Sequence, residues 1–204
     1  MLLKLVYNIL YLELGMACHI LVLGHSFVNR LQQFSRQQQQ HNLDLDAKNF
    51  HVSYLGISGL TLKRAFWQIS AIDDLKPDAI FLDVGANDLD HTAEPDADFL
   101  AADVVEFANS LLLHTKFVYI TSAFHRLKPR RSDYERVLPA FNDTLRRACR
   151  GLQNVAFWPH RNMTLDWQKY MAGDGVHLNN EGLRKYARSI RGAALKARTN
   201  WCSI

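Results

Sequence analysis

The stretch HILVLGHSF, residues 19 to 27, decides the fold class of this chain. Its first six residues form a continuous apolar run that ends in glycine, which is typical of a strand covered on both faces. Apolar residues then recur at the spacing of a helix: Phe27, Leu31 and Phe34. We therefore predict a central strand at residues 19 to 24, followed by a sharp turn and a helix.

The alternation of short apolar runs and helical segments continues along the chain. Further strands are predicted at residues 50 to 56, 78 to 85, 116 to 123 and 154 to 158. Helices are predicted around residues 62 to 72, at 96 to 114, at 132 to 150 and from about 180 to 198. Phe66 and Phe99 are expected on the buried faces of two of these helices. Strands separated by helices favour a parallel sheet with right-handed crossovers, so we predict a three-layer α/β/α sandwich with five strands.

The composition fits one globular domain without a metal or disulfide framework. The chain has 204 residues, of which 48% are hydrophobic and 22% charged, and we expect one domain over residues 18 to 204 after an N-terminal extension over residues 1 to 17. Its three cysteines are widely spaced, which indicates reduced thiols and no metal site. The formal charge of +4 permits an anionic partner without requiring one. Nothing in the sequence indicates the oligomeric state.

The first 18 residues are apolar but do not resemble a membrane span. Lys4, Asn8 and Glu13 interrupt them well short of the ~20 apolar residues that a span requires. A secretion signal is the alternative, but Glu13 falls where its apolar centre should meet the cleavage site. We therefore expect a cytoplasmic protein without a stable membrane span.

Chemically useful residues follow the first three predicted strands, at the point where each strand ends. Ser26 follows the first strand in GHSF, Gly59 the second in GISGLT, and Asn87 the third in GAND. Each also has a structural interpretation: Ser26 as a helix N-cap, Gly59 as a turn residue with positive φ, and Asn87 as a turn former. Because the carboxyl ends of parallel strands meet at one edge of a sheet, we expect the three residues to lie close together.

The segment GDGVHLNNEG, residues 173 to 182, contains what a serine nucleophile needs. A serine hydroxyl reacts well only beside a base, and that base is oriented by a third group. Asp174 can fix the tautomer of His177, while the other ring nitrogen of His177 faces Ser26. The alternative is structural, with Asp174 capping the turn and His177 at the surface.

The four blocks GHS, GISG, GAND and DGVH, in this order and at these spacings, resemble the signature blocks of SGNH hydrolases, also called GDSL-type esterases and lipases. The resemblance spans residues 19 to 190 and implies the flavodoxin-like strand order 2-1-3-4-5. It implies Ser26 as nucleophile, His177 as general base and then acid, and Asp174 as its orienting partner. The amides of Ser26 and Gly59 and the side-chain amide of Asn87 would form the oxyanion hole.

One position departs from the family pattern, and several other residues have open roles. The family's first block usually reads Gly-Asp-Ser, whereas His25 stands in the middle place here, either packed between strand and helix or altering the field on Ser26. We list His25 and His125 as possible substrate contacts, with Arg126 at the same sheet edge as His125. Three aromatic residues could wall an acyl pocket or serve packing alone: Trp158, Trp167 and Tyr170.

These features predict a serine hydrolase that cleaves small carboxylic esters through an acyl-serine intermediate, without cofactor or metal. Short-chain or acetyl esters are favoured, because no long lid insertion is present. One alternative is an esterase-like accessory domain that binds nucleic acid, as similar domains in some retrotransposons suggest, using RLKPRR (126 to 131), RRACR (146 to 150) and arginines of the last helix. Another, prompted by His25, is a catalytically silent binder of carbohydrate or lipid.

Overall fold

A five-stranded parallel sheet forms the centre of the protein. The computed structural model describes residues 17–90, 96–161 and 163–202, so the extension predicted before Cys18 lies outside the described residues except for Ala17. The strand order is β2-β1-β3-β4-β5, which confirms the predicted topology. The strands are β1 (Cys18–Gly24), β2 (Phe50–Gly56), β3 (Ala79–Asp83), β4 (Phe117–Thr121) and β5 (Val155–Trp158).

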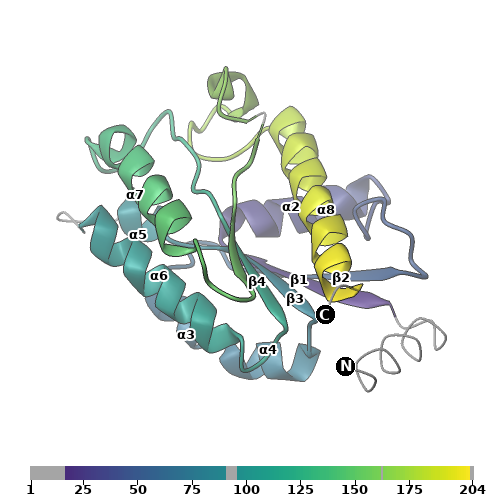
Figure 1. The fold of residues 1–204 in the computed structure, drawn as a ribbon. Coiled ribbons are helices and arrows are strands. Elements are labelled where there is room, and N and C mark those ends of the chain that lie inside the picture. The colour runs from purple at the N-terminus through teal and green to yellow at the C-terminus, as the bar shows by residue number, and fades with distance from the viewer. Residues whose placement is uncertain (1–16, 91–95, 162, 203–204) are drawn as a thin grey trace.

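Helices cover both faces of this sheet, as predicted, and give three layers (Figure 1). One face carries α2 (Ser26–Gln37) and α8 (Asn180–Cys202), with the short 3-10 helix η1 (Trp167–Tyr170) before α8. The other face carries α3 (Leu62–Phe66), α4 (Ile69–Leu75), α5 (Ala86–Leu89), α6 (Ala97–Leu111) and α7 (Tyr134–Ala148).

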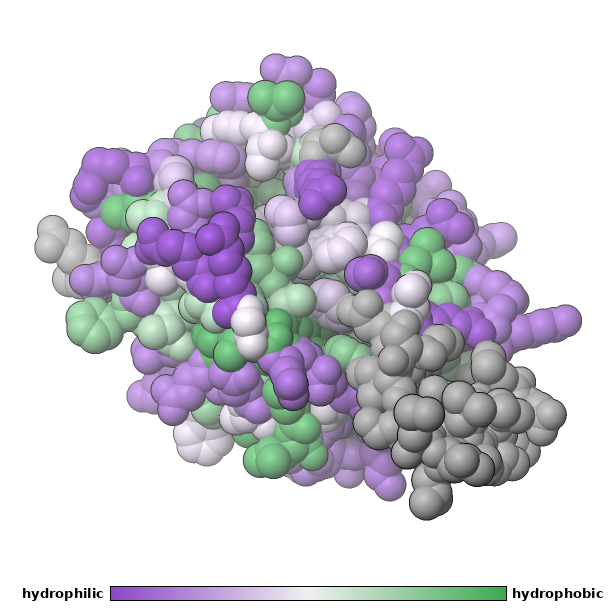
Figure 2. All heavy atoms as spheres, in the orientation of Figure 1, coloured by the Kyte–Doolittle hydropathy of each residue, from purple (hydrophilic) through white to green (hydrophobic). Residues whose placement is uncertain are grey.

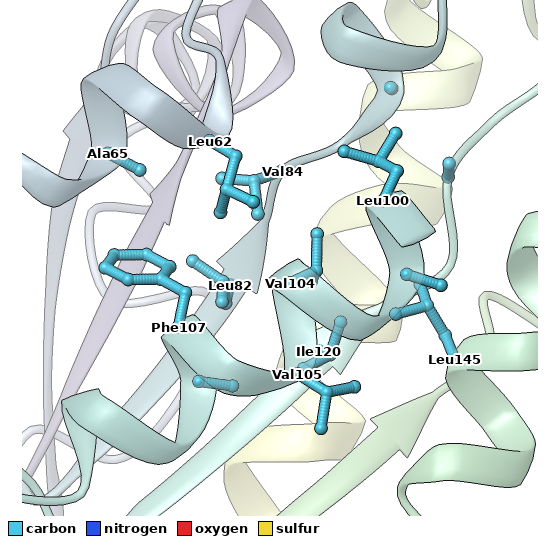
Figure 3. Packing of buried hydrophobic residues seen from close by; sticks show 14 of the residues in the cluster. Leu62, Ala65, Leu82, Val84, Leu100, Val104, Val105, Phe107, Ile120 and Leu145 are labelled. Carbon is cyan, nitrogen blue, oxygen red and sulfur yellow. The ribbon is translucent and has the colours of Figure 1, made fainter. Parts of the chain in front are cut away.

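The strands divide the core into two halves because successive side chains point to opposite faces of a sheet. Leu82 and Ile120 pack with Phe107 of α6 in one half (Figure 3). Their neighbours Phe81 and Tyr119 stack in the other half, with ring centroids 5.0 Å apart. Every residue of β3 and β4 is buried, and each large apolar side chain contributes roughly 1.5–3 kcal/mol on burial.

Two predictions about the helices are wrong. The helix expected around residues 62 to 72 is divided at Trp67 and Gln68, and Phe66 is 45% exposed, with its ring lying against Phe107. Phe99 is 74% exposed, because α6 turns a different face to the sheet. That buried face comprises Leu100, Ala101, Val104, Val105, Phe107, Ala108 and Leu111.

Close packing of α2 against β2 positions the amino end of α2. A Cβ atom on Gly56 would lie 2.3 Å from the backbone nitrogen of Asn29, so only glycine fits at this crossing.

Hydrophilic residues cover most of the molecular face drawn in Figure 2, with hydrophobic residues between them. Over the described ranges, no helix has the length and apolar character that crossing a membrane requires.

Candidate active site

Ser26 stands at the junction of β1 and α2, as the first residue of the helix. The N-cap is His25, whose Nδ1 accepts a hydrogen bond from the backbone N–H of Phe27 at 3.4 Å. The N-cap of α2 is therefore His25 and not Ser26, for which the sequence had suggested that role. The Ser26 hydroxyl is half-buried and lines a cleft at the carboxyl ends of the strands.

His177 and Asp174 reach Ser26 from the loop before α8. The Nε2 atom of His177 lies 3.0 Å from Oγ of Ser26, and its Nδ1 lies 2.8 Å from Oδ2 of Asp174. The other carboxylate oxygen, Oδ1, accepts the backbone N–H groups of Val176 and His177, both at 2.9 Å. Asp174 therefore shapes its own turn and orients the imidazole at the same time.

The surroundings keep the imidazole neutral and the carboxylate charged. Partial burial lowers the pKa of His177, and the charge of Arg30 lowers it further, against the hydrogen bond of Asp174, so the pKa lies below 6.5. Burial raises the pKa of Asp174, but hydrogen bonds from the amides of His177 and Val176 and from the His177 ring outweigh it and hold that pKa well below its usual value. A neutral His177 can accept the proton of Ser26.

Gly59 and Asn87 line the same cleft as Ser26. Gly59 has φ +68°, which lets the loop after β2 turn there. Within the described residues, neither the Ser26 nor the Gly59 backbone N–H has a hydrogen-bond acceptor. Both donors are thus available to a ligand.

The Asn87 side chain is held at both ends. Its Nδ2 donates to the carbonyl of Leu60 at 2.9 Å, and its Oδ1 accepts from Nη2 of Arg126 at 2.9 Å. Since the amide nitrogen carries two hydrogens, one remains for the cleft.

Arg126 is anchored beneath Asn87 by a carboxylate that sequence reasoning missed. Its Nη1 pairs with Asp90, and the side chains of both residues are almost completely buried. The same carboxylate accepts the backbone N–H groups of Arg130 and Arg131 at 2.7 and 3.1 Å. Asp90 follows Asn87 by three positions in GANDLD, and that spacing was the only available signal.

A match to a known protein family agrees with this geometry. A family model described as the GDSL-like lipase/acylhydrolase family matches residues 22–185. The chain belongs to this family. No curated protein matches the sequence.

Solved structures share the GDSL-type fold at low sequence identity. A protein of Bacteroides fragilis, described as a candidate acylhydrolase, is 16% identical with a TM-score of 0.72, over 88% of this chain and 87% of that chain. A lipase from a goat rumen metagenome is 13% identical with a TM-score of 0.64, over 87% and 97%. A catalytic mutant of an acetylxylan esterase from Geobacillus stearothermophilus is 16% identical with a TM-score of 0.64, over 88% and 96%.

His25, where GDSL-type proteins usually have an acid, does not fit the role of a substrate contact. Its side chain is 2% exposed, and Nε2 lies 3.3 Å from Oδ1 of the buried Asp83. The hydroxyl of Tyr186 donates to the other Asp83 oxygen at 2.6 Å. Burial raises the pKa of Asp83, but His25 and the Tyr186 hydrogen bond more than offset this and lower it. The first proposed alternative, packing between strand and helix, describes His25.

His125 also turns away from the cleft. Its Nδ1 lies 2.5 Å from Oε2 of Glu135, and its ring stacks on Trp167 with centroids 4.7 Å apart. Among the described residues, the lining of the cleft includes neither His125 nor the three aromatic residues considered for an acyl pocket. The hydrogen bond to Glu135 and the stacking on Trp167 thus describe His125 in this structure, and its contact with a substrate stays a prediction.

Proposed function

We propose that this GDSL-type protein is a serine hydrolase that cleaves carboxylic esters through an acyl-serine intermediate. The observation that carries the proposal is the chain of short contacts from Ser26 through His177 to Asp174 at the wall of an open cleft of about 880 Å³. A hydroxyl, a neutral imidazole and an orienting carboxylate in this order are the parts that activate a serine nucleophile.

In the proposed reaction, Ser26 Oγ attacks the ester carbonyl while His177 Nε2 takes its proton. The tetrahedral oxyanion accepts hydrogen bonds from the amides of Ser26 and Gly59 and from Nδ2 of Asn87. His177, now protonated and paired with Asp174, gives its proton to the departing alcohol. Water then attacks the acyl-serine in the same way, with His177 again as base, and releases the acid and Ser26.

A small acyl group is favoured by the walls of the cleft. Val176 is the single large apolar side chain among its described lining residues, so a long acyl chain would find little surface on which to be buried. The acetylxylan esterase among the structural neighbours removes a short acyl group, as its name says. We therefore favour acetyl and other short-chain esters.

Labelling of the nucleophile tests the proposal. A fluorophosphonate probe should modify Ser26, as located by peptide mapping, and the Ser26→Ala variant should lose both labelling and hydrolysis of 4-nitrophenyl acetate. Ser70→Ala is a matched control, because Ser70 is exposed on α4 outside the cleft. Ester turnover that survives in Ser26→Ala would refute the proposal.

A further inference from the structure

The cleft beside Ser26 has walls that are polar and rich in cations. Among its described lining residues are five basic side chains and two acidic ones, and none is Phe, Tyr or Trp. The basic ones are Arg30, Arg64, Arg126, Lys128 and Arg130. A neutral sugar or an acyl chain would find no aromatic or broad apolar surface there.

Both acidic side chains of the cleft are already engaged. Asp90 is buried against Arg126, so these two charges compensate each other. Asp174 accepts hydrogen bonds from His177 and from two backbone amides, and it lies 3.4 Å from Nη2 of Arg30. Asp174 offsets part of the Arg30 charge, but among the described residues neither carboxylate forms an ion pair with the other cations of the cleft.

Two of those cations are held in place by neutral carbonyl groups. Nη1 of Arg64 donates to the carbonyls of Gly59 at 3.0 Å and Ser58 at 3.4 Å, which puts its charge beside the Gly59 amide. Nζ of Lys128 donates to the carbonyl of Gly173 at 3.4 Å, on the loop that carries Asp174. In the described part of the chain, no carboxylate forms an ion pair with either side chain. No carboxylate of the described residues therefore offsets their charges at the cleft.

The third cation, Arg30, is ion-paired with Asp174 and stands on the helix that carries the nucleophile. Arg30 follows Ser26 by four positions, so both side chains lie on one face of α2. Arg30, Arg64 and Lys128 thus approach the cleft from α2, from α3 and from the loop after β4. An anion bound among them would lie next to the reacting ester.

We propose that this cleft selects esters whose alcohol part carries a carboxylate or a phosphate. The selection rests on the ester hydrolysis proposed above and names its substrate class. Guanidinium groups present paired N–H donors that match the oxygens of both anions. The short acyl group binds at Ser26 and the oxyanion donors, while the anionic alcohol part contacts Arg30, Arg64 and Lys128.

A set of aryl acetates that differ only in charge tests the selection on the unmodified protein. The probes are 4-acetoxybenzoate, 4-acetoxyphenyl phosphate, the neutral methyl 4-acetoxybenzoate and the cationic 4-acetoxyphenyl-trimethylammonium ion. Each kcat/KM is divided by the rate constant for reaction of the same ester with imidazole, a neutral nucleophile, which removes differences in leaving-group reactivity without adding a charge effect. We expect the better anion to exceed the neutral ester by about tenfold or more, and the cation to be the poorest. The ranking of the two anions distinguishes carboxylate from phosphate.

Variants and added salt test whether the cations of the cleft cause the preference for anionic esters. In Arg64→Gln and Lys128→Met the ratio of anionic to neutral kcat/KM should fall about threefold or more, whereas Arg191→Gln, on the exposed face of α8, should leave it unchanged. Raising the salt concentration to about 0.5 M should shrink the same ratio in the wild-type protein, which needs no variant to fold.

The outcomes distinguish failure of the anion selection from failure of the ester hydrolysis. Equal normalised rates for anionic and neutral esters overturn the anion selection while ester hydrolysis stands. A salt-independent preference that also survives both variants overturns the assignment to these cations. Absence of turnover for all four esters, with Ser26 unlabelled by fluorophosphonate, removes both proposals together.

Discussion

The guanidinium of Arg126 fixes the orientation of the Asn87 amide. Its Nη2 donates to Oδ1 of Asn87 at 2.9 Å, so the nitrogen of that amide must point the other way, toward the Leu60 carbonyl and the cleft. The pair is separated by 39 positions in the sequence, and Asp90 holds the arginine from beneath. In the proposed reaction, this contact sets the Asn87 donor in place before any substrate binds.

Arg126→Lys should lower kcat more than it raises KM. Lysine keeps the charge next to Asp90 but lacks the planar fork that also reaches Asn87. We expect kcat for 4-nitrophenyl acetate to fall about tenfold to a hundredfold, with a stability loss of about 1–2 kcal/mol. Arg136→Lys, an exposed arginine paired with Asp133 outside the cleft, is the control. An unchanged kcat in a folded Arg126→Lys protein contradicts the positioning role.

Asn87→Ala removes the side-chain donor itself. Loss of one donor of this kind slows turnover by roughly 10² to 10³. Steady-state kinetics with 4-nitrophenyl acetate would show the loss, together with slower fluorophosphonate labelling of Ser26. A rate equal to that of the wild type would exclude Asn87 from the oxyanion hole.

Asp174→Asn should leave the turn intact and impair the base. The amide oxygen can still accept the backbone N–H groups of Val176 and His177, but it no longer stabilises a protonated imidazole. We expect kcat to fall by about 10³ to 10⁴, with little change in the melting temperature. If the variant keeps more than a tenth of the activity, Asp174 is a structural residue only.

The acid limb of the pH profile should report His177. The neutral imidazole is the active form and its pKa is lowered from 6.5, so kcat/KM should be constant through neutral pH and fall with a midpoint below 6.5. Arg30→Gln removes a charge that lowers this pKa, so the midpoint should move to higher pH. Arg191→Gln serves as the comparison, since it removes an equal charge away from the cleft. A limb centred above 6.5 in the wild type would contradict the assignment.

His25→Asp, which restores the residue usual in the family, should destabilise this chain. The new carboxylate would face Asp83 in a buried site, and two carboxylates there cannot both ionise without a large penalty. We expect a loss of about 2–4 kcal/mol at pH 8, because the folded pair must retain a proton that the unfolded chain has released. The loss should shrink toward pH 5. Thermal unfolding at both pH values, with His25→Asn as a variant without like charges, measures it.

The parallel sheet could be predicted because its buried strands are continuous apolar runs, as in β1 and β3, whereas its strand order followed from the resemblance to the family. The meeting of Ser26, Gly59 and Asn87 at one cleft followed from that topology, since all three stand just after strands of one parallel sheet. Asp174 and His177 lie close in sequence, and that spacing placed them together. Their catalytic roles stay proposals that the variants above test.

Other features could not be predicted, because they depend on contacts between segments that are distant in the sequence. Arg126 and Asp90 come from different loops, and no local pattern shows that their charges pair. Phe99 is exposed because α6 is rotated about its axis relative to the predicted orientation. The spacing of apolar residues along a helix does not define this rotation closely. The inward position of His25 likewise depends on Asp83, 58 positions later in the printed sequence.

The hydrogen bond from Tyr186 to Asp83 ties the floor beneath the nucleophile to the last helix of the chain. During synthesis, β1 and Ser26 leave the ribosome long before α8 does, and until then Asp83 has no hydroxyl to satisfy it. The buried carboxylate below Ser26 therefore gains this hydrogen bond only once the C-terminal helix has docked on the sheet.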